Sequence, residues 1–167
     1  KGTSMNYSDL ASVKARDDVT IQETVSTWLG AFERALVSGD EQAVTSLFEV
    51  EGNWRDVVAF TWHLSPCVGA NEIAKRLVSR QSSVGAKGFE ISSTRTPPRR
   101  VKRLGRDCIE AIFSFETKVG QGEGVLRLTP TTDDDGIADH KAWVISTALE
   151  TLKGFEEKSG DNRPTGA

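Results

Sequence analysis

The chain has 167 residues, about the length of one globular domain. With 37% apolar and 27% charged residues it can build one core, and its net charge of −3 disfavours a dedicated nucleic-acid binder. The longest apolar runs, such as 57–60, have four residues, far from the ~20 of a membrane helix, and no hydrophobic signal segment opens the sequence. Cys67 and Cys108 are too few for a disulfide scaffold, so we expect a cytoplasmic protein.

The first strong helical pattern begins at Thr20. Residues 1–16 are polar and without periodicity, which is typical of a loose, flexible N-terminal arm. The segment 20–23, with the sequence TIQE, fits a capping box at the start of a helix. Apolar residues then recur at helical spacing over 21–36, and Gly39 follows as a stop signal.

Two shorter helices and a pair of strands follow the first helix. Apolar spacing and capping residues predict helices over 41–48 and 72–81. The aromatic and β-branched stretch between them predicts strands around 53–56 and 61–68. The first half of the chain is therefore expected to supply three helices and one strand pair.

The second half of the sequence changes to the alternating pattern of strands. Strands are predicted over 88–93, 99–105, 107–118, 123–129 and 140–152. We expect a turn at 120–122, a polar loop over 129–136 and a linker over 153–167. The C-terminal end of the last strand could alternatively be helical. Helices followed by antiparallel strands predict an α+β fold, with helices packed on one face of a curved sheet.

The segment 47–77 carries a specific order of features. A Leu-Phe helix end is followed by an acidic turn, a Trp-x-Asp strand, a second strand, and a glycine before a helix. This order resembles the NTF2-like (SnoaL-like, ketosteroid isomerase-like) fold, and the resemblance covers residues 17–152. It implies a cone in which three N-terminal helices pack on a strongly curved, mostly antiparallel sheet around a deep pocket. It also implies a small apolar ligand and a homodimer formed through the sheet.

Short segments at both ends of the domain support a narrower resemblance. The segments 54–56 (WRD), 60–62 (FTW), 152–157 (LKGFEE) and 163–164 (RP) resemble the N-terminal extension of fungal and bacterial flavin-containing monooxygenase-like proteins. The resemblance implies that this chain is a non-catalytic pocket or docking module of an oxidoreductase, and that FAD and NADP belong to a missing domain after the linker. No G-x-G-x-x-G follows a strand here, so we expect no cofactor in this chain.

Asp56 is the candidate general base. It resembles the position where ketosteroid isomerase-like proteins keep a catalytic carboxylate, and the aromatic residues around it would form an apolar wall that raises its pKa. Those isomerases also use a tyrosine phenol, and the single tyrosine here, Tyr7, lies in the expected arm. The alternative is structural: Asp56 pairs with Arg55 or caps the next turn.

His63 is the second catalytic candidate. A pair of His63 and Asp56 would suit a cofactor-free dehydratase, isomerase or cyclase. Trp62 and His63 alternate along a strand, so only one of them can face the pocket, and a solvated or core His63 is the alternative. A third class of function, an interaction or dimerisation domain without chemistry, also fits the sequence.

The aromatic residues are numerous for one domain, and part of the set is expected to line the pocket while the rest forms the core. The pocket candidates are Trp28, Phe32, Trp54, Phe60, Trp62, Phe113, Phe115 and Trp143.

A basic cluster lies within twelve residues of the second half: Arg95, Arg99, Arg100, Lys102, Arg103 and Arg106. Such a cluster can bind phosphates, and it can equally be a solvated strand edge protected from pairing. The spacing of cysteines, histidines and the acidic residues 133–135 fits no metal-binding motif, so we expect no metal.

Overall fold

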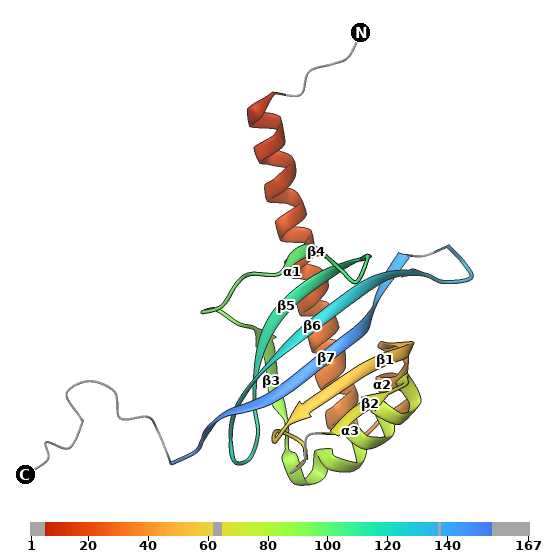
Figure 1. Ribbon diagram of the computed structural model, residues 1–167, viewed down its shortest axis with the longest axis vertical. Helices are drawn as coiled ribbons and strands as arrows, with labels where there is room; N and C mark the ends of the chain where they lie inside the picture. The colour runs from red at the N-terminus through yellow and green to blue at the C-terminus, as the bar shows by residue number, and fades with distance from the viewer. Residues whose placement is uncertain (1–5, 62–64, 137, 155–167) are drawn as a thin grey trace, which may run out of the picture.

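The computed structural model describes residues 6–61, 65–136 and 138–154. Within these residues, ten elements follow one another: α1 (Tyr7–Ser38), α2 (Glu41–Ser46), β1 (Phe48–Val57), β2 (Ser65–Val68), α3 (Ala70–Val84), β3 (Lys87–Ile91), β4 (Arg99–Arg103), β5 (Arg106–Glu116), β6 (Gly120–Thr132) and β7 (Ala138–Leu152). Figure 1 shows α1 passing across one face of a curved sheet, with its first turns extending beyond the sheet. The predicted α+β fold, with helices on one face, is confirmed.

The seven strands of the described segments form one sheet in the order β2-β1-β7-β6-β5-β3, and β4 pairs with β5. All neighbours are antiparallel except β1 and β7, which run parallel. The strand β7 continues without interruption to Leu152, so the helical alternative for its end does not hold. No helix within the described segments is long and apolar enough to cross a membrane.

The helix α1 begins at Tyr7, so the predicted start at Thr20 is wrong. The Thr20 hydroxyl donates to the carbonyl of Arg16 (3.0 Å), which places it inside the helix rather than at a cap. Residues 7–16, expected to be a loose arm, form the first turns because they contain no glycine or proline. An ion pair between Asp17 and Arg100 of β4 (2.9 Å) holds this part of the helix to the sheet.

The apolar stripe predicted on the first helix is confirmed as its buried face, and it packs on the inner face of the sheet. Its buried members are Ile21, Val25, Trp28, Leu29, Phe32, Ala35 and Leu36. Trp28 stacks on Phe32 and meets Phe48 of β1 edge-on, and its indole N–H donates to the Leu47 carbonyl (3.0 Å). Gly39 ends the helix in the left-handed conformation (φ 67°), as the sequence predicted.

The glycines at the start of β6 lie within the strand, and the turn predicted at 120–122 is therefore misplaced. Gly122 pairs with Phe115 and Gly124 with Phe113 of β5. A Cβ atom at either glycine would overlap the facing aromatic ring, so these positions make room for the rings on the inner face. The turn itself lies just before, where Thr117 accepts from the amide groups of Val119 and Gly120.

Candidate functional site

Asp56 lies near the end of β1 with its carboxylate fully buried. One oxygen, Oδ2, accepts from the backbone amides of Phe60 (2.9 Å) and Thr61 (2.8 Å) and from the Thr61 hydroxyl (3.2 Å). The other, Oδ1, accepts from the hydroxyl of Thr147 on β7 (2.6 Å). Four donors on two oxygens compensate for the burial of the charge, and they tie the residues after β1 to the sheet.

The Thr147 hydroxyl connects Asp56 to a neighbouring tryptophan. The Trp54 indole N–H donates to Thr147 Oγ1 (3.0 Å), which in turn donates to Asp56. Both side chains belong to the inner face, because Trp54 and Asp56 are two residues apart on β1 and β7 runs beside them. Thr147 was not among the residues predicted for the site; its only sequence signal is a polar residue at an inward-facing position of the last strand.

The carboxylate of Asp56 holds a strained turn. Val58 has a φ of 64°, a left-handed conformation that is a genuine outlier for a β-branched residue. The amides of Phe60 and Thr61 fold back onto Asp56 beyond this residue, so the hydrogen bonds compensate for the strain. These contacts correspond to the cap of the next turn that the sequence left open as an alternative. The role of Asp56 as a general base stays a prediction.

The strained turn forms one wall of a cavity of about 590 Å³ at the mouth of the cone. The other walls come from the end of α3, from the β5–β6 turn and from the end of β7. The apolar lining residues are Val58, Ala59, Phe60, Val84, Val119, Leu149 and Leu152. Asp56 itself does not line the cavity; it lies behind the turn that does.

Most of the aromatic pocket candidates belong to the core. Trp28, Phe32, Trp54, Phe113 and Phe115 are buried in one continuous cluster that fills the interior of the cone. The sequence predicts that part of the aromatic set lines the pocket and the rest forms the core, but it cannot say which residues belong to which, because aromatic residues favour both environments.

The remaining candidates lie in three different places. Phe60 is the candidate that lines the mouth cavity, with its ring against Trp54 and Phe115. Trp143 is half-buried elsewhere, with the Arg106 guanidinium 4.4 Å from its ring centre. Trp62 and His63 lie outside the described residues.

The residues of the basic cluster in the second half each pair with a carboxylate. Arg99 and Arg103 pair with Glu110, Arg106 with Glu49, and Arg95 with Glu123. Lys102 and Arg100 pair with Asp107 and Asp17. Every member of the cluster therefore has an acidic partner, which weakens its case as a general phosphate-binding patch and fits the solvated strand edge.

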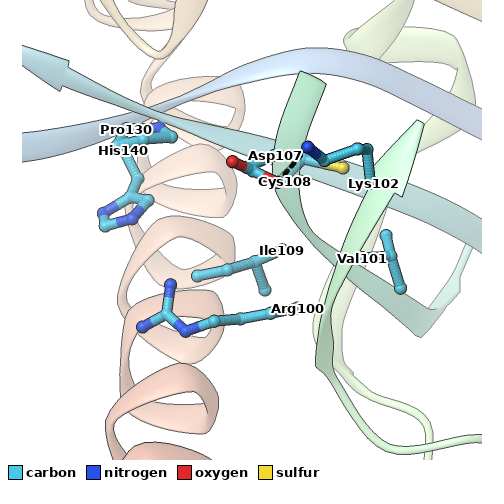
Figure 2. Close-up of a pocket in the computed structure, with 8 residues that line it drawn as sticks. All are labelled: Arg100, Val101, Lys102, Asp107, Cys108, Ile109, Pro130 and His140. Atoms are coloured by element: carbon cyan, nitrogen blue, oxygen red, sulfur yellow. Dashed lines mark ion pairs between the residues drawn. The ribbon is translucent and has the colours of Figure 1, made fainter. Parts of the chain in front are cut away.

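A second cavity, of about 440 Å³, lies at the opposite end of strands β5 and β7. Figure 2 shows Arg100 of β4 and His140 of β7 reaching into the same space, while Lys102 is joined to Asp107. Burial lowers the pKa of His140; the Asp139 carboxylate opposes this shift, and the charge of Arg100 adds to it. Within the described residues, no three potential metal ligands come together, at this cavity or away from it.

Comparison with known proteins identifies the fold. No protein-family model and no curated protein matches the sequence. An NTF2-like protein with a cystatin-like fold from Novosphingobium aromaticivorans superposes with a TM-score of 0.54 at 14% identity, over 88% of this chain and 92% of that one. A ketosteroid isomerase-like protein from Erwinia carotovora atroseptica gives 0.53 at 13% identity, over 80% and 97%.

A third structure agrees with these two. An NTF2-like superfamily protein from Salmonella enterica serovar Typhimurium matches with a TM-score of 0.51 at 12% identity, over 83% of this chain and 97% of that one. At such identities the likeness concerns the fold alone. The chain thus has the NTF2-like cone that the sequence predicted, a fold that the first of these comparisons also describes as cystatin-like.

Proposed function

We propose that this protein is a small-molecule-binding module whose ligand is largely apolar and sits in the cavity at the mouth of the cone. The observation that supports this most is the lining itself: apolar side chains dominate, and hydroxyl groups are interspersed among them. Such walls with a few polar groups are typical of small-molecule sites. The likeness in fold to a ketosteroid isomerase-like protein supports the same proposal by analogy.

The polar residues that line the cavity indicate which polar group the ligand would carry. Arg80 of α3 and Glu150 of β7 are exposed at the lining, and within the described residues neither forms an ion pair. A ligand with an apolar body and one polar or anionic group would place the body against Phe60 and Leu149 and the polar group toward Arg80.

The test uses the dye 8-anilinonaphthalene-1-sulfonate, an apolar ring system with one anionic group. Val119 lines the cavity but is 55% exposed, so Val119→Trp obstructs the cavity without disturbing the core. We expect this variant to bind the dye about tenfold more weakly than the wild type, measured by fluorescence titration.

The matched control is Val50→Trp, at an exposed position of β1 outside the cavity, for which we expect unchanged affinity. Equal dye binding by Val119→Trp and the wild type, with both variants folded, would contradict the proposal.

The catalytic alternative keeps Asp56 as the general base of a cofactor-free isomerase, cyclase or dehydratase. A base has to reach its substrate, and Asp56 is separated from the cavity by the turn that it anchors. The contacts therefore favour binding over catalysis. A screen of enolisable substrates decides the matter: turnover that disappears in a folded Asp56→Asn variant would establish the alternative.

The flavin-linked and dimeric interpretations stay predictions. If the chain is a module of a flavin-containing monooxygenase-like protein, FAD and NADP bind outside it, and the isolated chain will purify colourless. The predicted homodimer would use the outer face of the sheet, where Ile112, Val125 and Val144 are half-buried. Sedimentation of the wild-type chain as a monomer at high concentration would refute the dimer.

A further inference from the structure

We propose that the cavity between β4, β5 and β7 is a second ligand site, and that it binds a small carboxylic acid through Arg100 and His140. It lies at the other end of β5 and β7 from the cone mouth, and no residue lines both cavities. The inference is therefore independent of the function proposed above.

Asp17 holds the guanidinium of Arg100 in place, but it does not occupy all of the N–H donors of that group. Asp17 of α1 accepts from Arg100 Nε (3.0 and 3.2 Å to its two oxygens) and from Nη2 (2.9 Å). A guanidinium has five N–H donors in a rigid plane, so one carboxylate along this edge leaves Nη1 and part of Nη2 free. Asp17 thus fixes the plane of Arg100 and presents the remaining edge, which suits a second carboxylate in bidentate geometry.

His140 supplies the second contact from the opposite side of the space. Its imidazole is half-buried, and it points toward the same space as the Arg100 guanidinium (Figure 2). The lowered pKa keeps the ring uncharged near neutral pH, with one N–H donor available. An anion next to the ring would favour its protonated form and would therefore bind more tightly as the pH falls.

The other charged groups near His140 lie on β4, β5 and β7. Lys102 pairs with Asp107 on the lining, Asp139 accepts from the amide of His140, and Lys141 is the next residue of β7. Their charges balance approximately, so the site offers directed donors rather than a general positive field.

Apolar lining makes the site selective for an organic acid. Ile109 and Pro130 form the apolar part of the lining beside Arg100 and His140, whereas the side chains of Val101 and Cys108 point to the other face of the strands (Figure 2). A cavity of about 440 Å³ accommodates a body of the size of one aromatic ring. A carboxylate on such a body would meet Arg100 and His140, while the body itself would contact the apolar part of the lining.

The experiment titrates the full chain with benzoate and follows the imidazole resonances by NMR. The chain has two histidines, and a His140→Gln variant assigns the signal. We expect the His140 resonance to shift on titration, and the affinity to be about fivefold higher near pH 5.5 than near pH 7.5. Benzamide, which has the same shape without the charge, should bind about tenfold more weakly.

Two variants of β4 test the residue that carries the proposal. Arg100→Gln should weaken benzoate binding about tenfold, whereas Arg99→Gln, which removes the same charge from the neighbouring residue paired with Glu110, should leave it unchanged. Both arginine side chains are 56% exposed, so both variants should stay folded. An unmoved His140 resonance, equal binding of benzamide, or equal losses in the two variants would overturn the proposal.

Discussion

The two faces of strands β5 and β6 are built from opposite chemistry. Toward the helices, Phe113 and Phe115 lie over glycines of the paired strand, and every one of these positions is buried. Toward the outside, the same strands carry a mixture of charged and apolar side chains: Glu110 binds Arg103 and Arg127, and Ile112 and Val125 are half-buried. At Gly122 and Gly124 the inner face offers no space for an added atom, whereas the outer face has part-exposed side chains that can rearrange.

This difference shows which contacts contribute most to the stability of the fold. Burial of a large aromatic side chain contributes a few kcal/mol to the free energy of unfolding, and a packed face tolerates neither cavities nor extra volume. Ion pairs on a part-exposed face contribute much less, because water and salt screen them. Asp56 is the exception, a charge on the inner face, and its four hydrogen bonds explain how it is tolerated.

The largest effect is expected at Gly124. Its Cβ position overlaps the Phe113 ring and the Ser146 carbonyl oxygen, so Gly124→Val should destabilise the fold by about 4–5 kcal/mol, measured by urea unfolding.

Gly30 in α1 is the matched control for this substitution. Its Cβ position approaches only the flexible Arg34 side chain, so Gly30→Ala should stabilise the protein by about 0.5–1 kcal/mol through helix propensity. A mild effect at Gly124 would mean that the inner face is looser than the contacts indicate.

Removal of the buried carboxylate should have the next largest effect. Asp56→Ala leaves the amides of Phe60 and Thr61 without their acceptor and releases the strained Val58, at an expected cost of about 3–4 kcal/mol. Asp56→Asn can still accept from these amides, but it cannot accept from Thr147 at the same time, so about 1–2 kcal/mol is expected.

Asp134→Ala in the exposed loop after β6 serves as the control and should change the unfolding free energy little. A fully stable Asp56→Ala variant would show that the carboxylate does not anchor the turn.

The smallest effect is expected on the outer face, at Glu110. Hydrogen bonds from Arg103 and Arg127 lower its pKa to about 2, against the opposing effect of burial. A carboxylate with a lowered folded-state pKa stabilises the fold above its unfolded pKa, and this contribution disappears as the pH falls from about 4.5 through 2. Glu110→Gln should therefore reduce the free energy of unfolding by about 1–2 kcal/mol at neutral pH. As the pH falls from about 4.5 through 2, this variant should lose less stability than the wild type.

Glu72, in an exposed pair with Arg76 on α3, is the matched carboxylate, and Glu72→Gln should cost less than about 0.5 kcal/mol. If both variants lost stability to the same extent as the pH falls, the network around Glu110 would contribute no more to stability than an ordinary surface ion pair.

Much of the fold follows from periodicity. The stripe from Ile21 to Leu36 and the alternation of Ile109 to Phe115 place the buried faces of α1 and β5 correctly. The start of α1 was misplaced because a capping-box pattern also occurs inside helices, where the threonine hydroxyl bonds the preceding turn. The glycines of β6 were assigned to a turn because glycine indicates both turns and close approach, and only the partner strand separates these meanings.

The candidate site was harder to predict from the sequence than the fold. Asp56 stood out, but its partner Thr147 lies on the last strand, and no local pattern connects them. Both cavities are lined by the ends of strands that are distant in sequence, so their lining depends on the strand order. The basic cluster was visible as charge, whereas its acidic partners come from α1, β1, β5 and β6.

The parallel pairing of β1 with β7 has a consequence for how the chain folds. Asp56 and Thr147 are 91 residues apart, and Trp54 and Thr147 are 93 apart, so the anchor of the turn is among the most non-local contacts of the molecule. Contacts of this kind form late, because the intervening chain must first lose its freedom. While the chain emerges from the ribosome, residues 48–61 are exposed long before β7 exists. The wall of the mouth cavity therefore takes its final shape only once the last strand has been made and docked.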